Sequence, residues 1–535
     1  MKRTDIISFF LISLLLSLPA GYEPDHFAKV LFAGAFIQSL VYGFVLTWLV
    51  RTSVKLRRLV VSIVYILFCF ESFIFFRFGS RFDPNILTLM LQTNVGEVKE
   101  FLSVYIATPF TLFFCIVAVS CYVIICRLLG DSAIVRWDNR EGRSLWLIAM
   151  LVTVGGMLVR YLPLPFPIGE NAVNRLVTSI DFVKDRHAEI EKMEEAIDSI
   201  VVTRSPEMEE SPVIVVVIGE SFNKYHSSLY GYGLPTSPRL EKERESNHLM
   251  CYSSAMSPTN GTDVAMRLIF TLKGCEEDDS ASLCPFVLMP AVFRKAGYRV
   301  AYFDNQYTRS SGGSLDYSCG YFLNPSYIND HCFDFRNSEV CSYDGDFIDL
   351  YREDFLKGNK SLDIIHLKGQ HFDAALRFPS QFSVFGQGDI KRTDLSEKER
   401  LRVADYDNAT LYNDYVLGMI IDEFREENAI IIYFSDHGEH IYDGGKQYYG
   451  RGFGSKYEEE TVKAVYEVPF MIWCSDGFIS RNSSMYAAIR ETVECPICTA
   501  DLPYLLFDIA GIEFNYHDRS RSVINRDFRP HEVRF

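Results

Sequence analysis

The hydrophobic residues of this chain are concentrated in its first third. Within the first 163 of 535 residues, five apolar stretches approach the roughly 20 residues that a helix needs to cross a bilayer. This pattern predicts a five-span membrane anchor made of Ile6 to Leu18, Ala28 to Val50, Leu59 to Phe76, Val104 to Leu129 and Leu145 to Leu162. The first stretch follows Lys2 and Arg3 and ends in Leu18-Pro19-Ala20, so it also fits a signal peptide.

Charged residues predict how this anchor is oriented. Basic residues cluster between the second and third stretches and around the connection of the fourth and fifth, which predicts that both connections are cytoplasmic. These residues are Arg51, Lys55, Arg57, Arg58, Arg127, Arg136, Arg140 and Arg143. Everything after Leu162 is then exported, whether or not the first stretch is cleaved.

The exported part carries the negative charge of the chain. The net charge is -16 overall and near -21 after residue 163. This balance argues against nucleic acid as a partner and leaves divalent metal ions or cationic headgroups as partners.

The hydrophobic pattern changes after the anchor. Residues 164–212 are more polar, and Asn171 to Val201 indicates one or two amphipathic helices that bridge to the next domain or a solvated linker helix. Residues 213–535 contain short, continuous apolar runs typical of buried parallel strands, separated by segments long enough for crossover helices. We therefore expect a multi-span α-helical membrane anchor over residues 1–163, the bridging linker, and an α/β domain with a mainly parallel sheet. Its strands are expected at Val213 to Ile218, Arg299 to Phe303, Asp363 to Leu367, Ile430 to Phe434 and Phe470 to Trp473.

Nine of the 13 cysteines lie after residue 250. An oxidising compartment outside the cytoplasm would let several of them pair. The spacing favours disulfides over a zinc cluster, the competing interpretation. The pairs we expect are Cys275 with Cys284, Cys332 with Cys341, and Cys495 with Cys498.

Candidate chemistry lies at the ends of two predicted strands. The run Ile432-Ile-Tyr-Phe-Ser-Asp436-His437-Gly438-Glu439 places an Asp-His pair directly after one strand. The first strand ends in Gly219-Glu220-Ser221, so Glu220 is expected at the same sheet edge. One nitrogen and two carboxylate oxygens suit a Zn²⁺ site, with an acidic loop and a solvated histidine as the alternative.

A nucleophile is expected in the segment Ser257-Pro-Thr259-Asn260-Gly261-Thr262-Asp263, which precedes a predicted helix. A hydroxyl at a helix N-terminus lies where backbone N–H groups favour an anion. A bound metal would lower its pKa and make it a nucleophile toward phosphorus. Thr262 is the leading candidate. It could equally be an ordinary helix cap, and Ser221, Ser257 and Thr259 are rival nucleophiles.

Taken in order, these segments resemble the membrane-bound phosphoethanolamine transferases that modify lipopolysaccharide, within the alkaline phosphatase and sulfatase superfamily. The resemblance covers nearly the whole chain. Besides the anchor, Glu220 and Thr262, it includes Ser228-Leu-Tyr-Gly-Tyr232, Thr236-Ser-Pro238, His366-Leu-Lys-Gly-Gln-His371 and Ser435-Asp436-His437-Gly438-Glu439.

The resemblance implies a function and roles for the site residues. Thr262 would take phosphoethanolamine from phosphatidylethanolamine as a covalent intermediate, and then pass it to lipid A or core sugars of lipopolysaccharide. The expected location is a bacterial inner membrane, with the catalytic domain in the periplasm. One zinc ion would be shared by Glu220, Thr262, Asp436 and His437. His371 would contact phosphate or a second zinc and His366 would bind substrate nearby in the same pocket, with a structural loop histidine as the alternative for either. Glu439 would orient the Asp-His loop, and Thr93 and Glu97 would hold the ethanolamine ammonium.

Two departures from the family pattern affect these expectations. Many members carry a further histidine about a dozen residues after the Asp-His pair, where this chain has Tyr448-Tyr449-Gly450-Arg451, which puts a second zinc in doubt. In the donor loop, Leu89 stands where members often carry Asn.

Three other functions remain open at this point. A glycerol-phosphate transferase resembling lipoteichoic acid synthase would share the metal site. A sulfatase would need Arg in a C/S-x-P-x-R signature, and Ser257-Pro258-Thr259 does not continue to Arg. A catalytically silent membrane scaffold would be expected to lose metal ligands, and all four are present.

Overall fold

A computed structural model describes the fold in two compact units. The described residues are 3–21, 28–50, 53–78, 82, 86–87, 90, 108–130, 171–207, 210–274, 283–307, 321–445, 449–451 and 459–530. Described residues up to Arg186 form the first unit, and those from His187 form the second.

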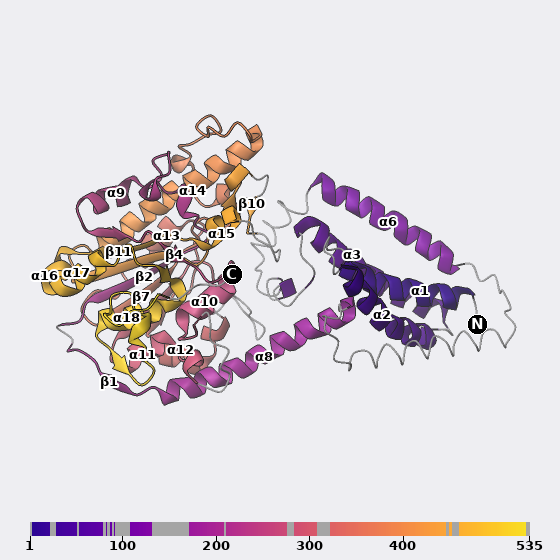
Figure 1. The fold of residues 1–535 in the computed structure, drawn as a ribbon, viewed down its shortest axis with the longest axis horizontal. Coiled ribbons are helices and arrows are strands. Elements are labelled where there is room, and N and C mark those ends of the chain that lie inside the picture. Colours follow the sequence, from indigo (N-terminus) through magenta and orange to yellow (C-terminus); the bar gives the residue numbers. More distant parts are fainter. Residues whose placement is uncertain are drawn as a thin grey trace. The chain divides into compact units, whose positions relative to one another are not determined.

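The first unit consists of apolar helices (Figure 1). They are α1 (Arg3–Ser17) followed by the short 3-10 helix Leu18–Gly21, α2 (Ala28–Val50), α3 (Val54–Phe78) and α6 (Pro109–Gly130), joined by the start of α8 (Ala172–Ser199). Two stretches, Val54–Arg77 and Pro109–Leu129, are long and apolar enough to cross a membrane, and Asp5–Ala20 and Ala35–Val50 are shorter. Helices thus form at four of the five predicted stretches. The five-span count stays a prediction, because Leu145 to Leu162 lies outside the described residues.

Polar contacts join the start of α8 to the apolar helices. Arg175 Nη2 lies 2.5 Å from Glu71 Oε2 on α3, and both side chains are at most 10% exposed. Next to this pair, Asn174 accepts a hydrogen bond from Tyr42 (2.6 Å) and donates one to Gln38 (2.9 Å). Glu71, an ionisable residue deep in a predicted span, is therefore neutralised by the bridging helix.

The second unit is built on a seven-stranded sheet in the order β3-β11-β8-β2-β7-β5-β6. Apolar residues fill both faces of its central strand: Ile214, Val216 and Ile218 pack on one side, and Val213, Val215 and Val217 on the other. This two-sided burial explains why the strands are continuous apolar runs. The strands are β2 (Val213–Gly219), β3 (Leu249–Cys251), β5 (Arg299–Asp304), β6 (Phe335–Arg336), β7 (Ser361–His366), β8 (Ala429–Ser435) and β11 (Phe470–Cys474).

Helices cover both faces of this sheet (Figure 1). One face packs against the end of α8 together with α10 (Thr262–Phe270), α11 (Met289–Lys295), α12 (Ser326–Cys332) and α18 (Leu502–Ala510). The other packs against α9 (Pro238–Glu245), α13 (Asp344–Tyr351) and α14 (Glu397–Phe424). The remaining helices are α15 (Glu459–Tyr466), α16 (Asp476–Arg481) and α17 (Ser483–Glu491).

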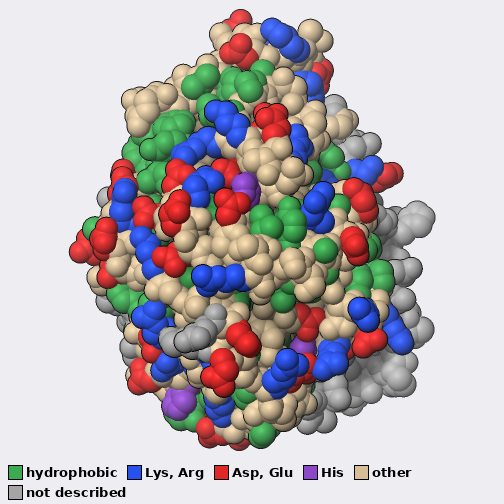
Figure 2. Space-filling model, turned by 90° about the vertical axis from the view of Figure 1, so that its left-hand side faces the viewer, with side chains coloured by type: hydrophobic (Ala, Val, Ile, Leu, Met, Phe, Trp, Pro, Cys, Tyr) green, Lys and Arg blue, Asp and Glu red, His purple; other side chains and the backbone are tan. Residues whose placement is uncertain are grey.

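Three two-stranded ribbons complete the unit. They are β1 (Val202–Arg204) with β13 (Glu513–Phe514), β4 (Ala255–Met256) with β12 (Ile497–Cys498), and β9 (His440–Ile441) with β10 (Tyr449–Gly450). On the side that carries α16 and α17, acidic and basic side chains are interspersed and hydrophobic ones occur in small groups (Figure 2). This mixture is typical of a solvated surface.

The prediction of a mainly parallel sheet was wrong, because the sheet is mixed. All five predicted strands form, but β11 runs antiparallel to both of its neighbours, β8 and β3. A short apolar run that is buried on both faces does not reveal its direction, so the sequence pattern could not identify this reversal.

The predicted disulfides are not seen among the described residues. No bond joins Cys332 to Cys341 or Cys495 to Cys498. Cys332 lies in the hydrophobic cluster on one face of the sheet, whereas Cys341 packs against the cluster on the other face. Proximity in sequence therefore does not bring these thiols together. Cys275, the expected partner of Cys284, lies outside the described residues.

We predict that removing one member of the Glu71–Arg175 pair destabilises the protein strongly. Glu71→Leu would leave a buried guanidinium without its carboxylate, at a cost of roughly 3–5 kcal/mol. The double variant Glu71→Leu/Arg175→Leu removes both charges and should recover most of this loss. Thermal unfolding of the full chain in detergent measures the stability of both variants. Equal losses of stability in the single and double variants would contradict the pairing.

Candidate active site

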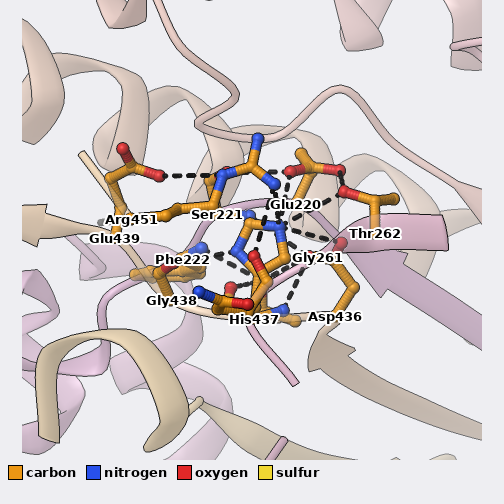
Figure 3. Close-up of polar contacts among 12 residues, drawn as sticks. Glu220, Ser221, Phe222, Gly261, Thr262, Asp436, His437, Gly438, Glu439 and Arg451 are labelled. Carbon is orange, nitrogen blue, oxygen red and sulfur yellow. Dashed lines mark hydrogen bonds and ion pairs between the residues drawn. The ribbon is translucent and has the colours of Figure 1, made fainter. Parts of the chain in front are cut away.

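The candidate site lies where β2 and β8 end side by side (Figure 3). Gly219 at the end of β2 pairs with Ser435 at the end of β8. Glu220 therefore emerges beside Asp436 and His437, and all three side chains are fully buried. One ligand atom from each lies within 4.8 Å of the others, as a metal site requires.

Thr262 joins this cluster as the first residue of α10. Its hydroxyl donates to Glu220 Oε2 (3.0 Å) and lies 3.2 Å from His437 Nε2. Its position at the helix start places the oxygen near backbone N–H groups that favour an anion. The structure thus brings together the four residues expected to share one zinc.

The rival hydroxyls have structural partners. Ser257 Oγ donates to the backbone oxygens of Asp436 (2.5 Å) and Thr259 (2.8 Å). Thr259 Oγ1 accepts from the backbone N–H of Gly261. Ser221 Oγ donates to Glu220 Oε1 at 2.8 Å, so it touches one carboxylate of the cluster. Among the four candidate hydroxyls, Thr262 is the one that contacts both Glu220 and His437 in the described contacts.

Backbone contacts hold the Asp-His loop. His437 Nδ1 lies 2.8 Å from the Gly438 carbonyl, and an N–H donated there leaves the Nε2 lone pair directed at the cluster. The Gly438 N–H donates to Val465 O (2.7 Å), which fixes the loop against α15. The Asp436 N–H donates to Gly219 O, which ties the loop to the end of β2.

The electrostatics of the cluster favour a cation. Burial and the negative charge of Glu220 raise the pKa of Asp436 to about 6. Burial also opposes ionisation of Glu220, but the neighbouring His437 outweighs this effect and lowers the pKa of Glu220. Asp436 Oδ2 is buried and accepts no hydrogen bond from the described residues. Two buried carboxylates, an imidazole and a hydroxyl fit Zn²⁺, which favours four nitrogen, oxygen or sulfur ligands.

His366 lies one layer behind the cluster, at the end of β7. Its Nδ1 lies 3.1 Å from Asp304 Oδ1, and its Nε2 accepts a hydrogen bond from Gln306 Nε2 (2.9 Å). Gln306 Nε2 also lies 3.2 Å from Glu220 Oε2. The side-chain amide of Gln306 therefore links His366 to Glu220. Asp304 and Gln306 were not predicted as site residues, although both follow the predicted strand Arg299 to Phe303.

His371 follows β7 by five residues and is partly exposed. The loss of water around the covered part of the ring lowers its pKa to about 3, against the Glu220 charge and with the Arg451 and Arg377 charges. The imidazole is thus neutral at physiological pH and could accept a hydrogen bond or hold a metal ion. Thr93 and Glu97, the candidates for binding the donor headgroup, lie outside the described residues.

Glu439 and Arg451 border the cluster on one side (Figure 3). Glu439 is 3% exposed, and its Oε2 lies 3.7 Å from Arg451 Nε. Arg451 Nη1 lies 2.9 Å from His437 Nε2. The sequence marked Arg451 as a departure from the family pattern, and the structure places it in contact with the site.

A second buried cluster supports the loops that carry the site. His226 Nδ1 lies 2.7 Å from Asp407 on α14, and its Nε2 lies 3.7 Å from Asp443. Burial alone would lower the pKa of His226, but the two carboxylates raise it to about 9. Asn223 donates to Glu439 O (2.9 Å) and Asp443 Oδ2 (3.1 Å), which connects this cluster to the Asp-His loop.

Comparisons with known proteins identify the family and the fold of this chain. Residues 212–512 match the family model described as Sulfatase. Over 487 residues the chain is 24% identical to the phosphoethanolamine transferase EptC of Escherichia coli, covering 84% of this chain and 79% of that protein. The crystal structure of the C-terminal periplasmic domain of E. coli EptC in complex with Zn has a TM-score of 0.52 and 23% identity, covering 63% of this chain and 91% of that one.

A further solved structure extends the likeness to nearly the whole chain. It is the integral membrane protein lipooligosaccharide phosphoethanolamine transferase A from Neisseria meningitidis, with a TM-score of 0.65 and 15% identity. The match covers 97% of this chain and 98% of that one. This match shows that the fold of each unit resembles the fold of that protein.

We predict that Gly369→Ala weakens metal binding. Gly369 has a positive φ of 50°, and a Cβ there would lie 2.8 Å from the backbone nitrogen and oxygen of Glu220. The substitution must therefore shift Glu220. Zinc content after dialysis should fall, whereas the control Gly388→Ala, where a Cβ meets nothing within 4 Å, should retain the wild-type content. Equal zinc content in the two variants would refute this role.

We also predict a pH-dependent contribution of His226 to stability. Because its pKa rises from 6.5 to about 9 on folding, its stabilisation is complete below pH 6.5 and is lost as pH rises to about 9. The difference in unfolding free energy between wild type and His226→Gln should shrink across this window. Denaturant unfolding at several pH values measures it, and a constant difference would contradict the prediction.

Proposed function

Because the chain belongs to the sulfatase family and its Glu220, Asp436 and His437 form a candidate metal site, we propose that it is a zinc-dependent phosphoethanolamine transferase. It takes phosphoethanolamine from phosphatidylethanolamine and passes it to lipid A or core sugars of lipopolysaccharide. The observation that carries this proposal is the Thr262 hydroxyl, which contacts both Glu220 (3.0 Å) and His437 (3.2 Å) at a helix N-terminus. The relatives named above are phosphoethanolamine transferases, which supports phosphoethanolamine as the transferred group.

In this proposal Glu220, Asp436 and His437, together with Thr262, hold the zinc ion. A bound zinc ion would lower the pKa of the Thr262 hydroxyl and neutralise charge that develops on phosphoryl oxygens. Burial of the ligands excludes water from one side of the cluster. Gln306 and Ser221, which contact opposite oxygens of Glu220, fix the orientation of that carboxylate.

The chemistry has two displacements at phosphorus. In the first, Thr262 Oγ1 loses its proton and bonds to phosphorus, while the bond from phosphorus to the lipid oxygen breaks and that oxygen gains a proton, releasing diacylglycerol. Glu220 Oε2 is the nearest acceptor for the hydroxyl proton. In the second, an acceptor oxygen displaces Thr262 Oγ1 and restores the hydroxyl. The covalent intermediate is a phosphothreonine diester that carries ethanolamine.

The same proposal assigns a location. A multi-span anchor in a bacterial inner membrane would place the catalytic unit in the periplasm, beside its lipid donor. Two helices of membrane-crossing length and the fold likeness to an integral membrane protein support this arrangement. Thr93 and Glu97 are proposed to hold the ethanolamine ammonium.

The other functions differ in what they predict for Thr262. A glycerol-phosphate transferase would use the same nucleophile with another headgroup. A catalytically silent scaffold would keep its function without the Thr262 hydroxyl. Sulfatase activity lacks support despite the family name, because Arg is missing after Ser257-Pro258-Thr259.

We predict that Thr262→Ala abolishes transfer in cells. Mass spectrometry of lipid A and core, analysed separately, should show a gain of one phosphoethanolamine with wild type and none with the variant. Thr203→Ala, which removes an exposed hydroxyl on β1, is the matched control and should behave as wild type. A glycerol-phosphate mass in place of phosphoethanolamine would establish the alternative headgroup. An unchanged gain in Thr262→Ala would exclude Thr262 as the nucleophile.

A further inference from the structure

Arg451 lies between the two segments that form the site. It follows β10, which pairs with β9 directly after the Asp-His loop and so returns the chain to that loop. Its Nη1 lies 2.9 Å from His437 Nε2 and 3.5 Å from Asn260 O, in the segment that leads to Thr262. One guanidinium thus contacts both the ligand loop and the nucleophile loop.

The exposure of Arg451 places it on the accessible side of the cluster. Its side chain is 20% exposed, whereas the side chains of Glu220 and His437 are fully buried. Thr262 is also partly exposed. Thr262 and Arg451 are thus the site residues around His437 Nε2 that solvent reaches. The guanidinium stands beside the proposed nucleophile as well, since both contact His437 Nε2.

The donor chemistry of Arg451 suits a phosphoryl group and excludes metal ligation. Arginine stays protonated and offers five N–H donors in a planar fork, with no lone pair for a metal. Arg451 Nε lies 3.7 Å from Glu439 Oε2, an ion pair that keeps the guanidinium beside the cluster. When His437 Nε2 ligates a metal, its lone pair no longer accepts from Nη1. Nη1 would then have to move off Nε2, and from there it could donate to a non-bridging phosphoryl oxygen.

The charge balance around the cluster also supports a phosphoryl-binding role for Arg451. Glu220, Asp436 and Glu439 are three buried carboxylates. One divalent cation and the Arg451 guanidinium balance their formal charge. A second divalent cation would leave an excess of positive charge next to a guanidinium that cannot lose its proton.

We propose that Arg451 is a catalytic residue that binds the transferred phosphoryl group of a one-metal site. This inference rests on the proposed function and names a residue for it. Arg451 transfers no proton; it stabilises the negative charge on the non-bridging oxygens while Thr262 Oγ1 bonds to phosphorus and the lipid oxygen leaves. A planar, fixed cation supplies this stabilisation without a second metal ion.

The test uses the purified, zinc-loaded full chain and the variants Arg451→Met and Arg451→Lys. Arg352→Met removes a partly exposed arginine from the surface and serves as the charge-matched control. Zinc content is measured by elemental analysis, and the affinity for inorganic phosphate by calorimetry. Transfer is measured with a labelled phosphatidylethanolamine. Because the first two readouts do not depend on turnover, they separate a phosphate-binding role from a metal-holding role.

We expect one zinc ion per chain in wild type, Arg451→Met and the control. Phosphate affinity should fall roughly 10- to 100-fold in Arg451→Met, as for loss of a charged hydrogen bond. The transfer rate kcat should fall roughly 100- to 1000-fold, as for loss of one donor to a developing oxyanion. Arg451→Lys keeps the charge without the fork and should recover part of both losses.

Several results would overturn the inference. They are two zinc ions per wild-type chain, loss of zinc in Arg451→Met, or an unchanged phosphate affinity in that variant. If wild type transfers no phosphoethanolamine, the proposed function fails separately, and the phosphate and zinc measurements still decide the role of Arg451.

Discussion

The parallel pairing of β2 with β8 is the constraint on which the site depends. Gly219 opposite Ser435 sets Glu220 beside Asp436 and His437, and the burial of both faces of β2 fixes that register. A slip of one residue would exchange the side chains of an entire strand between the two hydrophobic layers. The packing energy of the core therefore determines the position of the buried carboxylates. The sheet holds these carboxylates close enough to repel one another, and a bound cation would offset that repulsion.

The strands and their edge could be predicted from sequence because each depends on a local pattern. A continuous apolar run followed by polar residues indicates a buried strand that ends at a loop, and Glu220, Asp436 and His437 all follow such runs. Strand direction is different. It depends on the path of the chain between strands, and the apolar run of β11 contains no information on that path. The cysteine pairs failed for a related reason: Cys332 and Cys341 are nine positions apart in sequence but lie against opposite faces of the sheet.

Parts of the site beyond the metal ligands were less predictable. Asp304 and Gln306 carry no recognisable motif, and their roles arise because β5 and β7 are neighbours, which lets Gln306 bridge His366 and Glu220. In the sequence, Arg451 was recognisable only as a residue that differs from the family pattern. Its contact with His437 requires the β9–β10 ribbon, which is too short to produce a periodic signal. The role of a residue that acts through tertiary contacts can thus be assigned only when the fold is known.

The elements that position the site residues divide the site into two parts. Glu220, Asp436 and His437 follow strands in the centre of the sheet, where a shift would disturb the core. Thr262, His371 and Arg451 lie on a helix start, a loop and a short ribbon, and all three are partly exposed. Glu220, Asp436 and His437 have the fixed geometry that metal ligands need, whereas Thr262, the fourth proposed ligand, also has to meet the substrate. In the proposed function, groups that meet the donor and then the acceptor need an accessible surface that can differ between relatives. Loops provide such a surface, since insertions and substitutions there leave the core intact. Differences in acceptor among proteins of this fold should therefore arise in the segments around Thr262, His371 and Arg451, while the strand ends stay the same.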